Sequence, residues 1–140
     1  MKLKHILALM MAVAMMMLTV GCAENRVTRD EAKETTQSFL TAVSQGDFER
    51  ARSYMHPQWL GNLEGYFNGK ETALGIDFQK GIEVTKYTNF SSALYDSDVD
   101  GSEYELEARL TVDGAPLELE IEIVRNDQGY GIYTFEIDTD

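Results

Sequence analysis

The sequence is short of cysteine, proline, tryptophan and positive charge. Its 140 residues include one cysteine, two prolines and one tryptophan, with 12 Lys and Arg against 24 Asp and Glu, a formal net charge of −12. A lone cysteine, Cys22, excludes an internal disulfide, and so few prolines exclude a proline-rich linker. The strong acidity argues against nucleic acid or anionic lipid as the main partner, because both would repel the protein. It fits a well-hydrated body or a basic partner.

The uncharged hydrophobic stretch over residues 6–20 is too short to cross a membrane. Fifteen helical residues rise about 22 Å, whereas the hydrocarbon core is about 30 Å thick. The run follows a short positive start containing Lys2 and Lys4. This pattern predicts a signal peptide over residues 1–21.

The end of this leader, Leu18-Thr-Val-Gly-Cys22, resembles the bacterial lipobox. The resemblance implies that diacylglycerol is attached to the Cys22 sulfur and that cleavage makes Cys22 the first residue. Its amine is often acylated too, and two or three chains make anchoring stable. Ala23 follows rather than Asp, which under enteric-type sorting implies the outer membrane. The alternative is an ordinary secretory leader with an accidental cysteine.

The residues that follow the predicted signal peptide are enough for one domain. Residues 22–27 are expected to form a short lipidated tether and residues 28–140 a single domain. Without Lys2 and Lys4 the mature part has 10 basic and 24 acidic residues, a net charge of −14. Apolar residues make up 44% of the chain, so bulk disorder is not expected.

The first half of the domain reads as helices. Thr28 and Glu31 form a capping-box pattern, and Gly46 is expected to end the first helix. Its predicted buried stripe is Ala32, Thr36, Phe39, Leu40 and Val43. Asp47 can cap a second helix that carries Phe48, Ala51, Tyr54 and Met55. A third is predicted from Pro57 to Gly69, and residues 70–81 are predicted as a loop with an extra turn around 71–74.

The second half alternates apolar and acidic residues, which is typical of strands with one buried face. Asp113-Gly114 predicts a tight hairpin within residues 103–124. The predicted facing pairs are 112 with 115, 110 with 117, 108 with 119 and 106 with 121. A first strand is expected from Ile82 to about Tyr95, and a last strand after a loop over residues 125–129. In that last pairing Ile121 is expected to face Tyr133, Leu119 to face Phe135 and Leu117 to face Ile137.

Several short motifs resemble the nuclear transport factor 2-like superfamily. They are Phe39-Leu40-Thr-Ala-Val43, Gly46-Asp47-Phe48-Glu49, Ala51, Tyr54 and the closing Gly129-Tyr130-Gly131-Ile132. The resemblance implies a cystatin-like α+β cone, with helices packed on a curved four-stranded antiparallel meander. Ketosteroid isomerases, polyketide cyclases and bacterial lipoproteins share this fold. The catalytic pattern of those enzymes does not match any residues of this chain.

Three features of the sequence are candidate sites. His56, near Tyr54 and Trp59, could be a base lining an open pocket, but a lone histidine without an acidic partner is more often a structural loop residue.

The second feature is the outer face of the predicted hairpin, where Arg109 is expected to pair with Glu118, Glu107 to face Glu120 and Glu105 to face Glu122. These glutamates could be a solvated, aggregation-resistant surface or a docking face for a cationic partner.

The third feature matches the residue pattern of an EF-hand calcium loop and consists of Asp96, Asp98, Asp100, Gly101 and Glu107. However, a strand that begins at Glu103 would place Glu107 roughly 20 Å from Gly101 along the strand, too far to bind the same ion. We expect an acidic turn there, with weak calcium binding as the alternative.

These observations predict a lipid-anchored, non-enzymatic binding or assembly module of the cell envelope, attached through Cys22. Its expected partners are the membrane and a basic envelope protein, with no nucleic acid, cofactor or metal and no catalytic residue. The alternative is a protein with a pocket for an apolar small molecule, with or without the acid–base catalysis of polyketide cyclase-like relatives. An apolar cavity would favour the alternative, and a filled interior the module.

Overall fold

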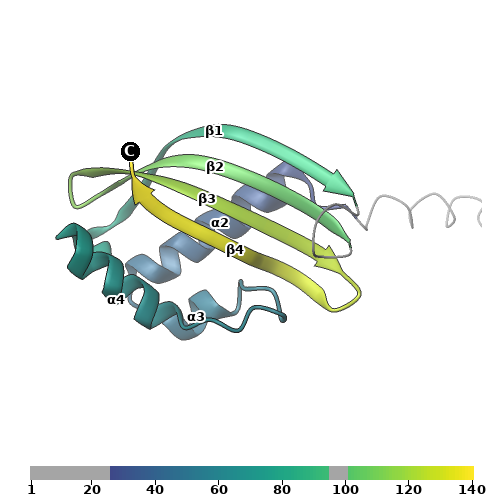
Figure 1. The fold of residues 1–140 in the computed structure, drawn as a ribbon, viewed down its shortest axis with the longest axis horizontal. Helices are drawn as coiled ribbons and strands as arrows, with labels where there is room; N and C mark the ends of the chain where they lie inside the picture. Colours follow the sequence, from purple (N-terminus) through teal and green to yellow (C-terminus); the bar gives the residue numbers. More distant parts are fainter. Residues whose placement is uncertain (1–25, 95–100) are drawn as a thin grey trace, which may run out of the picture.

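The computed structural model describes residues 26–94 and 101–140, which form helices followed by a curved, open antiparallel sheet. The elements are α2 (Arg29–Ser44), α3 (Phe48–Arg52), α4 (Leu63–Leu74), the 3-10 turn η1 (Phe78–Lys80), β1 (Ile82–Leu94), β2 (Ser102–Val112), β3 (Ala115–Asn126) and β4 (Gly129–Thr139). The strands pair in sequence order, with α2 crossing behind the sheet and α3 and α4 on the β4 side (Figure 1). The predicted α+β fold with a four-stranded antiparallel meander is confirmed.

Helix α2 begins with the predicted capping box. The Glu31 backbone N–H donates to Thr28 Oγ1 at 3.3 Å, and the Thr28 N–H donates to the Glu31 carboxylate at 3.0 Å. The predicted stripe is buried against the sheet: Ala32, Thr36, Phe39, Leu40 and Val43. Asp47 caps α3 as predicted, because its carboxylate accepts the Arg50 N–H at 3.0 Å.

The predicted third helix has the wrong bounds. It begins at Leu63, where the Asn62 side chain caps it, runs through Gly69 and ends at Leu74 before left-handed Gly75. The segment before this helix is tied to β4, because the His56 N–H donates to the Ile132 carbonyl at 2.8 Å. Residues 70–74, predicted as loop with an extra turn, therefore belong to α4.

The hairpin between β2 and β3 has the predicted register. Val112 faces Ala115, Leu110 faces Leu117, Ala108 faces Leu119 and Leu106 faces Ile121. Asp113 and Gly114 both have positive φ, 50° and 77°, as a two-residue turn of the expected type requires. One face of both strands is accordingly buried.

The predicted register between β3 and β4 is wrong by two residues. Ile121 faces Phe135, Leu119 faces Ile137 and Leu117 faces Thr139. The turn uses only Asp127 and Gln128, so pairing begins earlier than expected, and a β-bulge beside Glu122 adds one more residue to β4. Beyond the bulge the shift of two keeps Phe135 and Ile137 on their predicted buried face. Before the bulge the shift is one, so Ile132 is buried opposite Ile123.

Strand β1 follows the sheet through two bulges. Its inward residues are spaced two, three and three apart, yet they face residues of β2 that are spaced evenly. The pairs are Ile82 with Val112, Val84 with Leu110, Tyr87 with Ala108 and Phe90 with Leu106. The predicted first strand is confirmed as far as Leu94, whereas Tyr95 lies outside the described residues.

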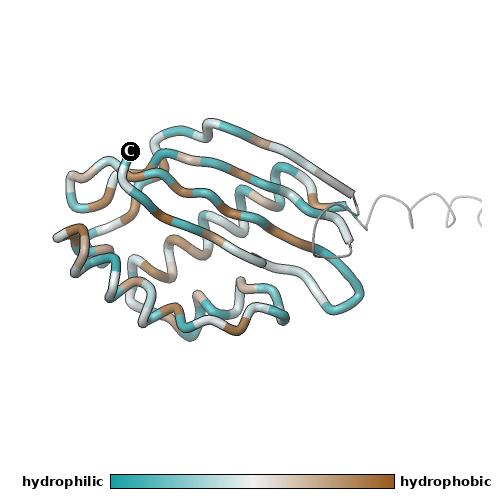
Figure 2. Tube along the Cα trace, in the orientation of Figure 1, coloured by the Kyte–Doolittle hydropathy of each residue, from teal (hydrophilic) through white to brown (hydrophobic). Residues whose placement is uncertain are grey.

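The interior between sheet and helices is filled by aromatic rings. Phe67 of α4 lies at the centre, 5.0 Å from Phe78, 5.8 Å from Phe135 and 6.1 Å from Phe39, measured between ring centroids. Phe67, Phe78 and Phe39 are each at most 1% exposed. Hydrophobic and hydrophilic residues alternate along the strands, and the hydrophobic positions contribute to this core (Figure 2).

Two residues of the predicted tether already contact the domain. The Val27 N–H donates to the Ser102 hydroxyl at 2.9 Å, and Val27 is buried. The Arg26 carbonyl accepts a hydrogen bond from the Arg125 guanidinium at 3.3 Å. Within residues 26–94 and 101–140, no helix is long and apolar enough to cross a membrane.

Candidate binding site on the acidic face of the sheet

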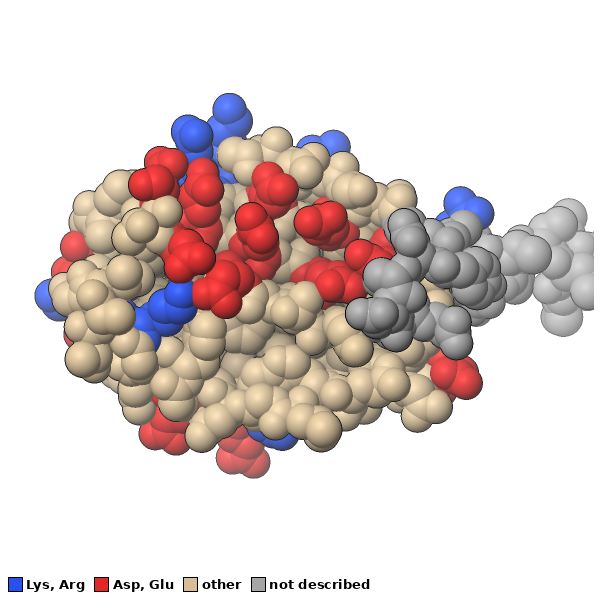
Figure 3. All heavy atoms as spheres, in the orientation of Figure 1, with Lys and Arg blue, Asp and Glu red and all other residues tan. Residues whose placement is uncertain are grey.

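Carboxylates gather on the face of the sheet that the helices leave uncovered (Figure 3). Alternation along β2, β3 and β4 turns every second residue outward. We call this surface the acidic face. It comprises Glu103, Glu105, Glu107, Glu118, Glu120, Glu122, Glu136 and Asp138.

The strand register sets like charges directly opposite one another. Glu105 faces Glu122, and Glu120 lies between Glu107 on one side and Glu136 on the other. Each such pair destabilises a sheet by roughly 0.2–1 kcal/mol. Among the residues that the structure describes, no cation forms an ion pair with Glu105, Glu120 or Glu122. Repulsion between these carboxylates therefore lowers the stability of the fold.

Positive side chains stand at its margins. Arg109 meets Glu118 at 4.0 Å, and this exposed contact contributes little. Lys70 of α4 reaches over the β4 edge, with its Nζ 2.6 Å from Glu136 and 2.9 Å from Asp138. The predicted pairing of Arg109 with Glu118 is thus confirmed, and negative charge is concentrated between these two cations.

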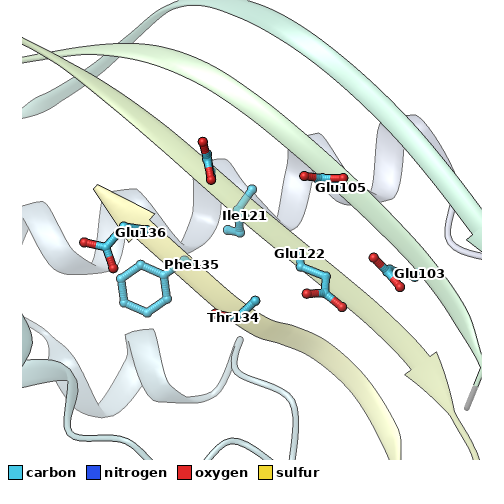
Figure 4. A pocket seen from close by; sticks show the side chains of 8 residues that line it. Glu103, Glu105, Ile121, Glu122, Thr134, Phe135 and Glu136 are labelled. Carbon is cyan, nitrogen blue, oxygen red and sulfur yellow. The ribbon is translucent and has the colours of Figure 1, made fainter. Parts of the chain in front are cut away.

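The acidic face is hollowed near its centre. A hollow of about 260 Å³ is lined by Glu103, Glu105, Glu120, Ile121, Glu122, Thr134, Phe135 and Glu136 (Figure 4). It lies beside the β3–β4 bulge at Glu122, and bulges bend a strand and redirect side chains. The lining contributed by side chains is mainly carboxylate, so the hollow favours a positively charged group.

Glu122 has the most perturbed carboxyl group of the hollow. Partial burial, the nearby charges of Glu103 and Glu105 and a hydrogen bond with Glu103 raise the pKa of Glu122 to about 7. The group therefore exchanges its proton close to neutral pH. A cation placed beside it would favour the ionised form and lower this pKa.

The acidic face offers electrostatic attraction for cationic side chains. A metal would need several donors converging on one point. Within the described part of the chain, no three His, Cys, Asp or Glu side chains are grouped to hold one. Spread carboxylates match a partner that carries several separate positive charges.

His56 is a structural residue of the core edge. It is 1% exposed, its Nδ1 accepts the Gln58 N–H at 3.1 Å, and its Nε2 lies 3.0 Å from Asn126 Oδ1. Both ring nitrogens thus have partners, and the Tyr133 ring packs edge-on at 5.9 Å. The interpretation as a satisfied loop histidine is confirmed, and His56 does not line an open pocket with Tyr54 and Trp59.

Two of the other predicted sites fall outside the described residues. They are the lipidation residue Cys22 and the aspartates Asp96, Asp98 and Asp100 of the EF-hand-like string. Glu107, the last member of that string, lies within β2 opposite Glu120, as the strand prediction required. The helix that an EF-hand needs at this point is therefore absent from residues 102–112.

The sequence interpretation identified the β2 and β3 carboxylates but missed the contribution of β4. Glu136 and Asp138 alternate with the buried Phe135 and Ile137, and this alternation could have assigned them to the same face. The hollow could not have been found in this way, because alternation predicts which face a residue is on but not the shape of that face.

The comparisons with known proteins give no relative. No model of a protein family matches the chain, and no curated protein matches its sequence.

Proposed function

We propose that this protein is a lipid-anchored binding or assembly module of the bacterial cell envelope, that it catalyses no reaction, and that it binds a basic envelope protein on its acidic face. The anchor is the lipidated Cys22, following removal of residues 1–21. In a Gram-negative cell the protein lies on the periplasmic side of the outer membrane. The fold we assign to it is the nuclear transport factor 2-like cone, and the order of helices and meander supports this assignment.

The observation that carries the proposal is the charge of three glutamates of the acidic face that no cation of the described residues compensates. Glu105, Glu120 and Glu122 repel neighbouring carboxylates and lack a cationic partner within the described residues. A cationic partner would relieve this repulsion on binding, so complementarity would add to both affinity and association rate. A solvated surface that only prevents edge aggregation does not require a hollow or a carboxyl group with a raised pKa.

The filled interior supports the module over the apolar-ligand alternative. Phe39, Phe67, Phe78 and Phe135 occupy the space between sheet and helices, with their rings in contact. The hollow described above lies on the opposite face of the sheet and is acidic. An apolar small molecule would find few matching groups there.

The anchor is tested by Cys22→Ser. This change should abolish palmitate labelling and move the protein from the detergent phase to the aqueous phase, because no thioether can form. Ala23→Ser is the matched control and should leave both readouts unchanged. A Cys22→Ser protein that stays labelled and membrane-bound would show that the leader anchors the chain in another way.

The binding face is tested by carbodiimide crosslinking in native membranes, which joins a carboxyl group to a lysine with loss of water. The double variant Glu105→Gln/Glu120→Gln should lose most of the crosslinked product identified by mass spectrometry. The control Glu49→Gln/Glu64→Gln removes two exposed carboxylates from the helices and should retain it. Equal loss in the two variants would place the partner elsewhere.

A further inference from the structure

Leu60 is an apolar side chain held in solvent. It is 91% exposed, and no other large hydrophobic residue of the described chain is exposed. It belongs to the segment 57–62, which the structure keeps out of α4. Its neighbours are the exposed Pro57 and the half-buried Trp59. This segment therefore presents a small apolar tip.

The segment is fixed in place by local contacts. Arg52 donates a hydrogen bond to the Gly61 carbonyl at 3.2 Å, and its guanidinium lies 5.5 Å from the centre of the Trp59 ring. The Trp59 ring covers Gly61 so closely that any side chain at position 61 would collide with it. Leu60 is thus exposed by a defined backbone conformation, with a cation and an amphipathic ring beside it.

The segment lies at the end of the domain where the described chain begins. Arg125 donates to the carbonyl of Arg26, and the next residue, Asn126, donates through its side chain to Gln58 at 3.0 Å. The turn between β3 and β4 therefore joins Arg26 on one side to the 57–62 segment on the other. Figure 1 shows this turn at the end of the sheet opposite the C-terminus.

The tether between Cys22 and Arg26 is short. Four residues span at most about 14 Å when fully extended. Lipid chains on Cys22 would fix that residue at the level of the lipid headgroups. The end of the domain that carries Arg26, the β3–β4 turn and the 57–62 segment would then be held close to the bilayer surface.

We propose that Trp59 and Leu60 contact the bilayer interface and orient the domain on the membrane, an inference that rests on the proposed lipidation of Cys22. Tryptophan is favoured at the boundary between headgroups and acyl chains, and Arg52 beside it can approach lipid phosphates. Neither residue has to bind lipid alone, because the anchor supplies the affinity.

Trp59 is the only tryptophan of the chain, so its fluorescence reports on this segment alone. The test uses the full lipidated protein, purified from membranes and reconstituted into phosphatidylcholine vesicles that contain lipids brominated near the headgroup. Leu60→Asp is compared with Ala73→Asp, which adds the same charge at an exposed position of α4. Sedimentation with the vesicles is measured on the same samples.

We expect the wild type and Ala73→Asp to sediment with the vesicles and to show quenched Trp59 emission. Leu60→Asp should still sediment, but its quenching should fall several-fold, because burial of one leucine changes an equilibrium by roughly tenfold or more. Sedimentation without quenching of the wild type overturns this inference and leaves the anchor intact. Equal quenching in Leu60→Asp overturns it as well. Failure of the wild type to sediment overturns the anchor and the inference together.

Discussion

The two faces of the sheet are built from the same strands but have opposite chemistry. The inner face carries Leu106, Leu110, Leu119 and Ile121, each at most 1% exposed, against aromatic rings. The outer face carries glutamates on the alternate positions of these strands. Burial of the inner residues stabilises the fold, whereas the outer residues repel one another and reduce that gain.

This difference separates what folds the protein from what it presents to others. The solvent-exposed face of a sheet needs polar residues, but it does not need eight residues of the same charge sign. Threonine, lysine or mixed charges would keep the face soluble without the repulsion. The excess of carboxylates on one face therefore points to a role outside folding, and the following changes test the contrast from the largest expected effect to the smallest.

Leu119→Ala should lower the free energy of unfolding by about 2–5 kcal/mol, because it opens a cavity at a fully buried position. Urea denaturation of the soluble domain measures this. The neighbouring outward change Glu120→Ala is the control and should stay within about 0.5 kcal/mol of the wild type. A similar loss of unfolding free energy in the two variants would contradict the contrast between a buried inner face and an exposed outer face.

His56→Ala should lower the free energy of unfolding by about 1–3 kcal/mol, since the Gln58 N–H and the Asn126 side chain lose their buried partner. Gln58→Ala, which removes an exposed side chain, should cost less. Denaturation curves of the two variants give the comparison. An unchanged stability with a lost envelope phenotype would instead assign His56 a direct functional role.

The protein should become more stable as the pH falls from about 8 to about 5. The pKa of Glu122 is raised in the folded state, so the folded protein binds a proton that the unfolded chain releases, and stability is lost as pH rises through 7. Partial exposure limits the effect to about 1 kcal/mol. Thermal melting at both pH values measures it, and Glu122→Gln should remove most of this dependence. A wild-type stability that rises toward pH 8 would contradict the burial of Glu122 among like charges.

Glu120→Lys should be neutral or should stabilise the domain by about 0.2–1 kcal/mol, because it places opposite charges across from Glu107 and Glu136. Arg109→Glu makes the reverse change opposite Glu118 and should destabilise by a similar amount. Both are measured by denaturation at low salt. A marked destabilisation by Glu120→Lys would show that repulsion does not govern this face.

Sequence patterns predicted the parts of the fold that depend on neighbouring residues. The capping box at Thr28, the turn at Asp113-Gly114 and the β2–β3 register follow from local chemistry and alternation. They did not predict where α4 begins, because two local signals compete: Pro57 favours a start there, whereas Asn62 caps the helix that forms from Leu63. The long-range bond of His56 to Ile132 holds the chain between α3 and α4 against β4.

The candidate site was predictable in composition but not in shape. Alternation assigned Glu105, Glu107, Glu120 and Glu122 to the outer face, and the structure confirms this assignment. Bulges in β1 and beside Glu122 break the alternation, because inward residues on either side of a bulge are three positions apart instead of two. The prediction assumed regular pairing and therefore missed them. The hollow lies beside the bulge at Glu122, and the raised pKa of Glu122 depends on its partial burial as well as on Glu103 and Glu105.

Whether the acidic face is the one that binds can be measured directly in cells. A photo-crosslinking amino acid is placed at Thr134, in the hollow, and in a second strain at Asn68, exposed on α4. Illumination of intact cells should give a discrete protein adduct from position 134 and none from position 68, and Glu105→Gln/Glu120→Gln should abolish the adduct. An adduct from position 68 alone, or one from 134 that persists without those glutamates, would contradict the account.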